Sequence, residues 1–366
     1  MGSRRVLPSL LSAVAVVAFA VGCSSDGSDG SDGAAGTPPT TEVGATGTVG
    51  PTTSPEAQAA VPSPGCGVDQ PAPGRTEESV VSGTDERSYV RYVPAGIDPK
   101  MPAPLVLDLT AYSPASLEEE FSGFTTKAGD GTVKADDEGI VVITPEPTNG
   151  AGALLTWNYA GTEGWSDDQA FMSDLLDEVE ASTCIDTSRV FLTGFAVGGV
   201  FASITACGQT DRFAALATVA GLYSPKDCDP SKPLPVIAFH GTGDRFVPFD
   251  GSIGSGPSGL GLTPETIEGL TFMASRDGAL ASSQAWAAHD GCRLEPNESP
   301  VIDGVTLQTW AGCDDGVAVE LYVIDGGEHT WPGSTGMDAF TDLLGPVSDK
   351  VVATDLIWDF FVAQTS

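Results

Sequence analysis

The hydrophobic pattern after residue 66 alternates between short apolar runs and longer amphipathic stretches. Seven segments predict strands because they are continuously apolar or alternate with polar residues: 87–93, 104–109, 140–143, 189–193, 216–219, 235–239 and 317–324. Three longer segments predict helices: 166–182, 280–289 and 351–362. Repeated strand–helix–strand units predict an α/β fold with a doubly wound, mostly parallel sheet. Residues 251–278 are rich in Gly and are interpreted as an insertion or lid loop.

The first 22 residues have the pattern of an export signal. Arg4 and Arg5 precede an apolar run from Leu10 to Val21, which is too short for a stable membrane span. The small residues before Cys23 resemble a bacterial lipoprotein cleavage site, which predicts that Cys23 becomes the lipidated first residue. The alternative is an ordinary secretory signal followed by an incidental cysteine.

Residues 23–65 are interpreted as a flexible tether. They consist almost entirely of Ser, Gly, Asp, Thr, Pro and Ala, and contain no aromatic residue. Such a segment buries too little apolar surface to offset the entropy of ordering it. We therefore expect one folded domain over residues 66–366, which is long enough for a sizeable core.

The charge balance excludes some partners. The chain has 16 Lys and Arg against 50 Asp and Glu, a formal net charge of −34. This field repels phosphate backbones, so no nucleic-acid partner is expected, and membrane contact is expected only through a lipid at Cys23. The scattered acids are typical of a soluble extracellular protein.

Six cysteines follow Cys23, and an even number in an exported chain predicts disulfides. Three bridges among six cysteines allow fifteen connectivities. The chain has no CxxC pair and only three histidines, so neither a metal site nor a cofactor is predicted.

The segment 190–199 combines a strand, a G-x-A-x-G-G motif and a helix. With Ser at the central position, this arrangement is the nucleophile elbow, a strained turn that exposes its central side chain above the sheet. Here the central residue is Ala196, flanked by Gly194 and Gly198. If the elbow persists without its serine, Ala196 should have a positive φ. The backbone N–H of Val197 is then a candidate oxyanion donor.

A carboxylate and a histidine follow in the order that this topology requires. Asp244 follows a predicted strand in His-Gly-Thr-Gly-Asp, and His329 lies in Gly-Gly-Glu-His-Thr-Trp-Pro-Gly after the next strand. We predict Asp244 as triad acid and His329 as triad base. His240 is expected to be structural, and His289 lies in a polar helix end.

Several motifs together give the chain a family resemblance from Cys66 to the C-terminus. The motifs are Cys184–Val190, Ala206-Cys207, Phe213–Ala215, His240-Gly241-Thr242-x-Asp244, Asp290-Gly291-Cys292 and Gly327-x-His329-Thr330-Trp331-Pro332-Gly333. The chain resembles the extracellular polyhydroxybutyrate depolymerase-like and feruloyl esterase group of α/β hydrolases. The resemblance implies the α/β-hydrolase fold, with esters of polyesters or of hydroxycinnamoylated polysaccharides as ligands. It also implies the triad roles of Asp244 and His329.

Two departures from the family pattern affect the predicted function. The family's serine is Ala196, which has no atom that can attack a carbonyl. The family's His-Gly pair after the second strand is replaced by Thr110 and Ala111, so the second oxyanion donor, expected at Ala111 or Tyr112, is altered.

The resemblance also implies a disulfide between Cys292 and Cys313. Cys207 closes the elbow helix and Cys228 precedes the next strand, so these two are predicted to pair. The remaining two cysteines, Cys66 and Cys184, are then predicted to form the third disulfide.

We therefore predict a lipid-anchored extracellular pseudo-esterase that keeps the fold and the ligand cleft. The alternative is an active carboxylic ester hydrolase that uses activated water or an unrecognised nucleophile. Four aromatic side chains are candidates for the cleft wall, with core or edge packing as the commoner alternative for each: Tyr112, Trp157, Trp165 and Trp331.

Overall fold

The computed structural model describes residues 59–365 except 99, 113, 130, 152–153, 159–160, 226–229, 253 and 257–276. The signal, Cys23 and most of the tether lie outside these residues, as does nearly all of the predicted lid loop. Within the described residues, no helix is long and apolar enough to cross a membrane.

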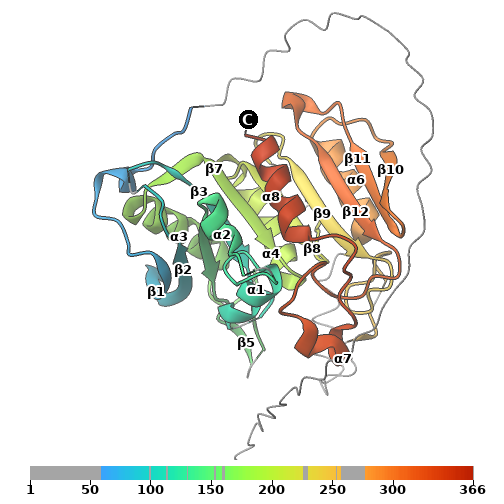
Figure 1. The fold of residues 1–366 in the computed structure, drawn as a ribbon, viewed down its shortest axis with the longest axis horizontal. Helices are drawn as coiled ribbons and strands as arrows, with labels where there is room; N and C mark the ends of the chain where they lie inside the picture. The colour runs from blue at the N-terminus through green and yellow to red at the C-terminus, as the bar shows by residue number, and fades with distance from the viewer. Residues whose placement is uncertain are drawn as a thin grey trace, which may run out of the picture. The chain divides into compact units, whose positions relative to one another are not determined.

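A ten-stranded sheet forms the centre of the folded unit (Figure 1). Its strands, in spatial order, are β1 (Gly74–Ser82), β2 (Asp85–Val93), β4 (Val141–Pro145), β3 (Ala103–Leu109), β7 (Ile185–Gly194), β8 (Ala215–Val219), β9 (Val236–Gly241), β12 (Val319–Ile324), β11 (Val305–Trp310) and β10 (Asn297–Ile302). The six strands from β4 to β12 pair in parallel, and the remaining pairs at both edges are antiparallel. A short hairpin of β5 (Asn149–Ala151) and β6 (Leu154–Thr156) forms a separate sheet.

Helices cover both faces of the large sheet, as Figure 1 shows. They are α1 (Ala115–Ser122), α2 (Lys134–Glu138), α3 (Asp168–Ser182), α4 (Val197–Gly208), α6 (Gly278–His289), α7 (Thr341–Leu344) and α8 (Ala353–Ala363). The core on one face contains side chains of α3, α4 and α6, and the core on the other contains those of α1, α2 and α8.

The continuous apolar runs arise because the central strands are buried on both faces. In β3, Leu105 and Leu107 point into one core and Val106 into the other. This two-sided burial is what a parallel sheet between helix layers requires. The predicted doubly wound α/β-hydrolase fold is confirmed.

Two of the predicted disulfides are present. Cys66 bonds Cys184 and Cys292 bonds Cys313. Cys207 is also disulfide-bonded, and its predicted partner, Cys228, lies outside the described residues.

The folded unit begins a few residues before the predicted boundary at residue 66. The Val61 amide donates to Asp186 Oδ1 at 2.9 Å, and the Ser63 amide donates to the Ile185 carbonyl at 2.8 Å. A Cβ on Gly65 would lie 2.2 Å from the Thr183 carbonyl oxygen. The end of the predicted tether therefore packs against β7, because these small residues allow close backbone approach.

Candidate active site

The elbow is present at the junction of β7 and α4. Ala196 has φ 51° and ψ −117°, which confirms the predicted positive φ. A Cβ on Gly194 would lie 2.7 Å from the Gly198 carbonyl carbon, and one on Gly198 would lie 2.0 Å from the Leu109 carbonyl oxygen. Both flanking glycines are therefore required by backbone contacts. Ala196 lies where this type of turn holds the nucleophile in G-x-S-x-G enzymes.

Asp244 and His329 lie together. His329 Nδ1 is 2.7 Å from Asp244 Oδ2, and the two residues are only 4% and 5% exposed. Asp244 Oδ1 accepts the amides of Phe246 at 2.8 Å and Val247 at 2.9 Å, which fixes the carboxylate. Burial acts to raise the pKa of Asp244, but His329 and the other hydrogen-bond donors lower it below its usual value.

Aromatic rings hold the histidine on two sides. The His329 ring lies 4.8 Å from the Phe195 ring and 5.1 Å from the stacked Phe246 ring, measured between centroids. Phe195 directly precedes Ala196, so the predicted triad base lies beside the elbow. Because Asp244 contacts Nδ1, the arrangement leaves Nε2 as the nitrogen for proton transfer. The catalytic roles of Asp244 and His329 stay predictions.

The other two histidines have partners of their own. His240 Nε2 lies 2.7 Å from the Val247 carbonyl, and burial lowers the pKa of His240, which favours its neutral form. This contact helps to fix the loop that carries Asp244. His289 Nδ1 lies 2.7 Å from Asp290 Oδ1 at the end of α6.

The segment after β3, where the second oxyanion donor is predicted, is fixed by two contacts. Trp157 Nε1 donates to the Thr110 carbonyl at 2.7 Å, and the Thr110 hydroxyl donates to the Tyr112 carbonyl. The Trp157 ring stacks on Phe201 of α4 at 4.6 Å. The close approach of Gly198 to Leu109 places this segment against the elbow. The roles of Ala111, Tyr112 and Val197 as oxyanion donors stay predictions.

Two of the four aromatic cleft candidates belong to the core. Trp157 and Trp331 are fully buried, and Trp331 Nε1 donates to Thr354 Oγ1 at 3.0 Å. Their indole N–H groups are used by internal acceptors, so neither side chain is free to line a cleft. Trp165 is 37% exposed and Tyr112 is partly buried, and both stay candidates.

Sequence reasoning missed a pair of buried carboxyl groups beside this site. Asp108 near the end of β3 and Glu118 in α1 are both fully buried. Asp108 was visible as one acidic residue within an apolar strand, a pattern that signals a buried polar contact. Glu118 gave no such signal, because it is one of three consecutive glutamates.

The sequence analysis also missed a buried ion pair, which lies near the loop that carries Trp157. Arg87 Nη2 lies 2.6 Å from Asp168 Oδ1, and both side chains are at most 1% exposed. Asp168 Oδ2 accepts the Asn149 side-chain amide at 2.9 Å and the Asn158 backbone amide at 2.5 Å. Asp168 thereby fixes the loop that carries Trp157.

No cluster of three or more metal-ligating side chains occurs among the described residues. The site therefore consists of an elbow without a nucleophilic atom, an acid–base pair and candidate backbone donors. These groups can support ligand binding, proton transfer and stabilisation of negative charge.

Comparison with known proteins identifies esterases as relatives. The chain is 26% identical over 260 residues to feruloyl esterase B of Piromyces equi, which covers 69% of this chain and 44% of that protein. It is 30% identical over 212 residues to the putative esterase NocK of Nocardia uniformis, covering 50% and 58% of the two chains. It is 26% identical over 305 residues to feruloyl esterase C of Emericella nidulans, covering 82% and 91%.

The chain has the α/β-hydrolase fold and is similar in sequence to esterases. No protein-family model matches it, and it spans less than two thirds of the first two relatives. Among solved structures, the acetyl xylan esterase of Aspergillus awamori is 13% identical with a TM-score of 0.46, covering 73% of this chain and 97% of that one. That likeness adds nothing to what the sheet topology establishes.

Proposed function

We propose that this esterase-like α/β hydrolase is a lipid-anchored extracellular pseudo-esterase, which binds an ester without efficient turnover. The observation that supports this most strongly is Ala196 at positive φ in a preserved elbow, beside the hydrogen-bonded pair of Asp244 and His329. The site keeps its backbone and its acid–base pair but lacks a nucleophilic atom at the elbow.

The magnitude of this loss supports binding rather than catalysis. Removing a triad nucleophile typically lowers turnover by on the order of 10⁶, leaving about 10³ to 10⁴ over the uncatalysed rate. An altered oxyanion donor would lower the remainder by about 10² to 10³.

The relatives suggest the ligand class. Two of them are named feruloyl esterases, and a third is named a bifunctional acetylxylan esterase/xylanase. We therefore propose a hydroxycinnamoyl or acetyl ester of a plant polysaccharide as the ligand, with a polyester as the alternative. The disulfides support an oxidising, extracellular location.

The proposal is tested with a fluorophosphonate probe, which labels an activated serine. We expect no labelling of the wild-type protein and clear labelling of Ala196→Ser, because the elbow directs that side chain toward His329. Hydrolysis of p-nitrophenyl acetate should rise in parallel. The control is Ala196→Ser with His329→Ala, which should lose the gain. Calorimetric titration of the wild type with a feruloylated oligosaccharide should show binding without release of ferulate.

A second candidate function is favoured by the intact pair of Asp244 and His329. As a general base on water, His329 could supply about 10² to 10⁴ in rate. This second function requires that the wild type hydrolyses p-nitrophenyl acetate about as fast as Ala196→Ser. It also requires that His329→Ala alone abolishes the activity, and both results together would replace the pseudo-esterase proposal.

A further inference from the structure

The buried carboxyls of Asp108 and Glu118 lie directly behind the two backbone segments of the candidate site. Asp108 precedes the segment 109–112, and Glu118 is in α1, which follows it. The Ser122 hydroxyl donates to Asp108 Oδ2 at 2.5 Å. Glu118 interacts with the carboxyl of Asp108 and with the backbone amides of Ala111 and Phe195.

These contacts of Glu118 are loose. Neither of its carboxyl oxygens has a partner of regular hydrogen-bond geometry among the described residues, and the same holds for Asp108 Oδ1. The two amides nevertheless belong to the two halves of the site. Phe195 precedes Ala196 in the elbow, and Ala111 lies in the segment of the predicted oxyanion donor.

The orientation of the Ala111 amide follows from its peptide plane. The Thr110 carbonyl accepts from Trp157 Nε1, and in a trans peptide the next N–H points the opposite way. The Ala111 N–H therefore points away from Trp157, which agrees with its contact to Glu118. Trp157 and Glu118 thus hold one peptide from its two sides, and the second oxyanion donor falls to Tyr112.

The charges around the pair favour a shared proton. Glu119 of α1 adds a second negative charge beside Asp108 and is itself paired with Arg75 of β1 at 3.0 Å. Glu146, after β4, accepts the Ala115 amide at the start of α1. No described cation pairs with Asp108 or Glu118. Two adjacent buried carboxyls without a cation cannot both ionise easily.

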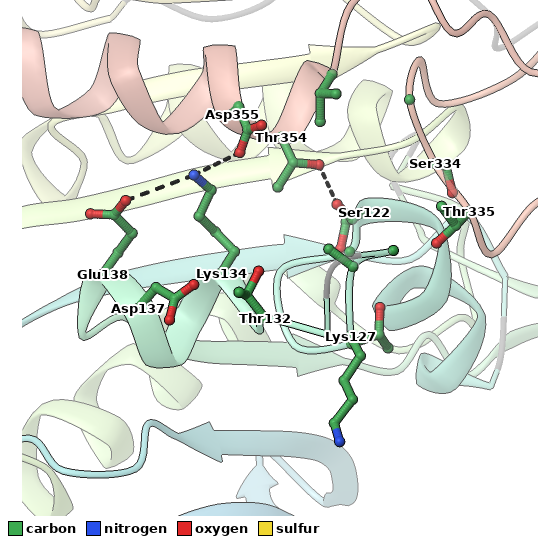
Figure 2. A pocket seen from close by; sticks show the side chains of 16 residues that line it. Ser122, Lys127, Thr132, Lys134, Asp137, Glu138, Ser334, Thr335, Thr354 and Asp355 are labelled. Atoms are coloured by element: carbon green, nitrogen blue, oxygen red, sulfur yellow. Dashed lines mark hydrogen bonds and ion pairs between the residues drawn. The ribbon is translucent and has the colours of Figure 1, made fainter. Parts of the chain in front are cut away.

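A surface pocket lies one side chain from the pair. Ser122, whose hydroxyl contacts Asp108, lines a pocket of about 400 Å³ together with Thr354 (Figure 2). Lys134 in this pocket pairs with Asp355 at 2.6 Å and lies 3.8 Å from Glu138.

We propose that Glu118 is a positioning residue, which holds segment 109–112 against the elbow as the protonated partner of a charged Asp108. Its O–H donates to Asp108, and its carbonyl oxygen faces the amides of Ala111 and Phe195. The functional part of this inference rests on the proposed function, because it concerns the same ligand site.

The proposed proton on Glu118 is tested by measuring the free energy of unfolding as a function of pH, without any ligand. Burial raises the pKa of Asp108 to about 7 and that of Glu118 well above its usual range, whereas both lie near ~4 in an unfolded chain. The folded state then binds more protons than the unfolded state, so stability falls as pH rises above ~4. In the proposed state, Glu118 still holds its proton above pH ~7. The loss of stability there should then raise the unfolding constant about tenfold per pH unit.

Glu118→Gln keeps a donor and an acceptor but cannot ionise, so this decline above pH ~7 should disappear. Glu119→Gln is the matched control, one residue along the same helix, and should keep it. Urea unfolding at a series of pH values measures both. An unchanged decline in Glu118→Gln would overturn the proposal.

The positioning role is tested in the Ala196→Ser background. Glu118→Gln should retain most of the hydrolysis of p-nitrophenyl acetate, whereas Glu118→Ala should lower kcat at least tenfold with little change in KM. Equal activity of the Gln and Ala variants would overturn the role. If Ala196→Ser itself gains no activity, the proposed function fails, and the pH series still decides on the proton.

Discussion

Ala196 keeps a backbone conformation that its side chain does not need. A positive φ costs a non-glycine residue about 1 to 3 kcal/mol and persists only where the surrounding structure enforces it. Here the turn is maintained by packing, because Gly194 and Gly198 contact backbone and the Ala196 amide donates to the Val219 carbonyl. The surrounding structure therefore enforces the elbow independently of the nucleophile.

This strain predicts that Ala196→Gly stabilises the protein by about 1 kcal/mol, since glycine adopts positive φ without the Cβ clash. Ala220, with φ 53°, should respond in the same direction. Ala202→Gly is the control, because Ala202 lies within α4, where glycine destabilises by about 1 kcal/mol. Urea denaturation measures all three. A loss of stability in Ala196→Gly comparable to that of Ala202→Gly would contradict the enforced elbow.

At the scale of elements, the sequence predicts best what is buried on both faces. The central strands β3, β7 and β9 were predicted because their apolar runs are continuous. The edge strands β1 and β10 were not, because nearly all of their side chains are partly or fully exposed and their sequences are polar. The short helices α1 and α2 also lacked a clear apolar period.

In the candidate site, too, some residues were predictable from sequence patterns and others were not. Gly194, Gly198, Asp244 and His329 were predictable, because motif spacing on a known topology places them. The role of Glu118 and the hydrogen bond from Trp157 to Thr110 could not be predicted, because they depend on which backbone groups face a buried side chain. Trp157 was a candidate for the cleft wall with core packing as the alternative, and its stacking on Phe201 and its bond to Thr110 place it in the core.

The two described disulfides differ in the length of chain that they close. Cys66–Cys184 spans 118 residues and Cys292–Cys313 spans 21. In the chain-entropy account, loops of these lengths stabilise by about 4 to 5 and about 3 kcal/mol. The longer bridge also joins the first residues of the folded unit to the start of β7.

We therefore expect the double Ser variant of Cys66 and Cys184 to lose more unfolding free energy than the double Ser variant of Cys292 and Cys313. The difference should be about 1 to 2 kcal/mol. Urea denaturation of the two variants under oxidising conditions measures it, with each variant serving as the other's control. Equal losses, or a larger loss for the shorter bridge, would contradict the expectation.

The charge of the whole molecule constrains how it can associate with a cell surface. A net charge of −34 repels anionic lipid headgroups, and the predicted removal of residues 1–22, which include Arg4 and Arg5, would make the chain more negative. Electrostatic attraction to an anionic lipid surface is therefore not expected to hold the protein at a membrane. The membrane association proposed above therefore depends on the proposed lipid at Cys23.

This dependence predicts that Cys23→Ser moves the protein from the membrane fraction to the medium. Each buried lipid CH₂ contributes about 0.8 kcal/mol, so two or more acyl chains give stable anchoring that does not depend on salt. Fractionation and immunoblotting of expressing cells should find the wild type in membranes before and after a high-salt wash. Ser24→Ala is the control and should stay anchored. Release of the wild type by salt would indicate attachment through a charged partner, and equal release of wild type and Cys23→Ser would identify the signal as an ordinary secretory one.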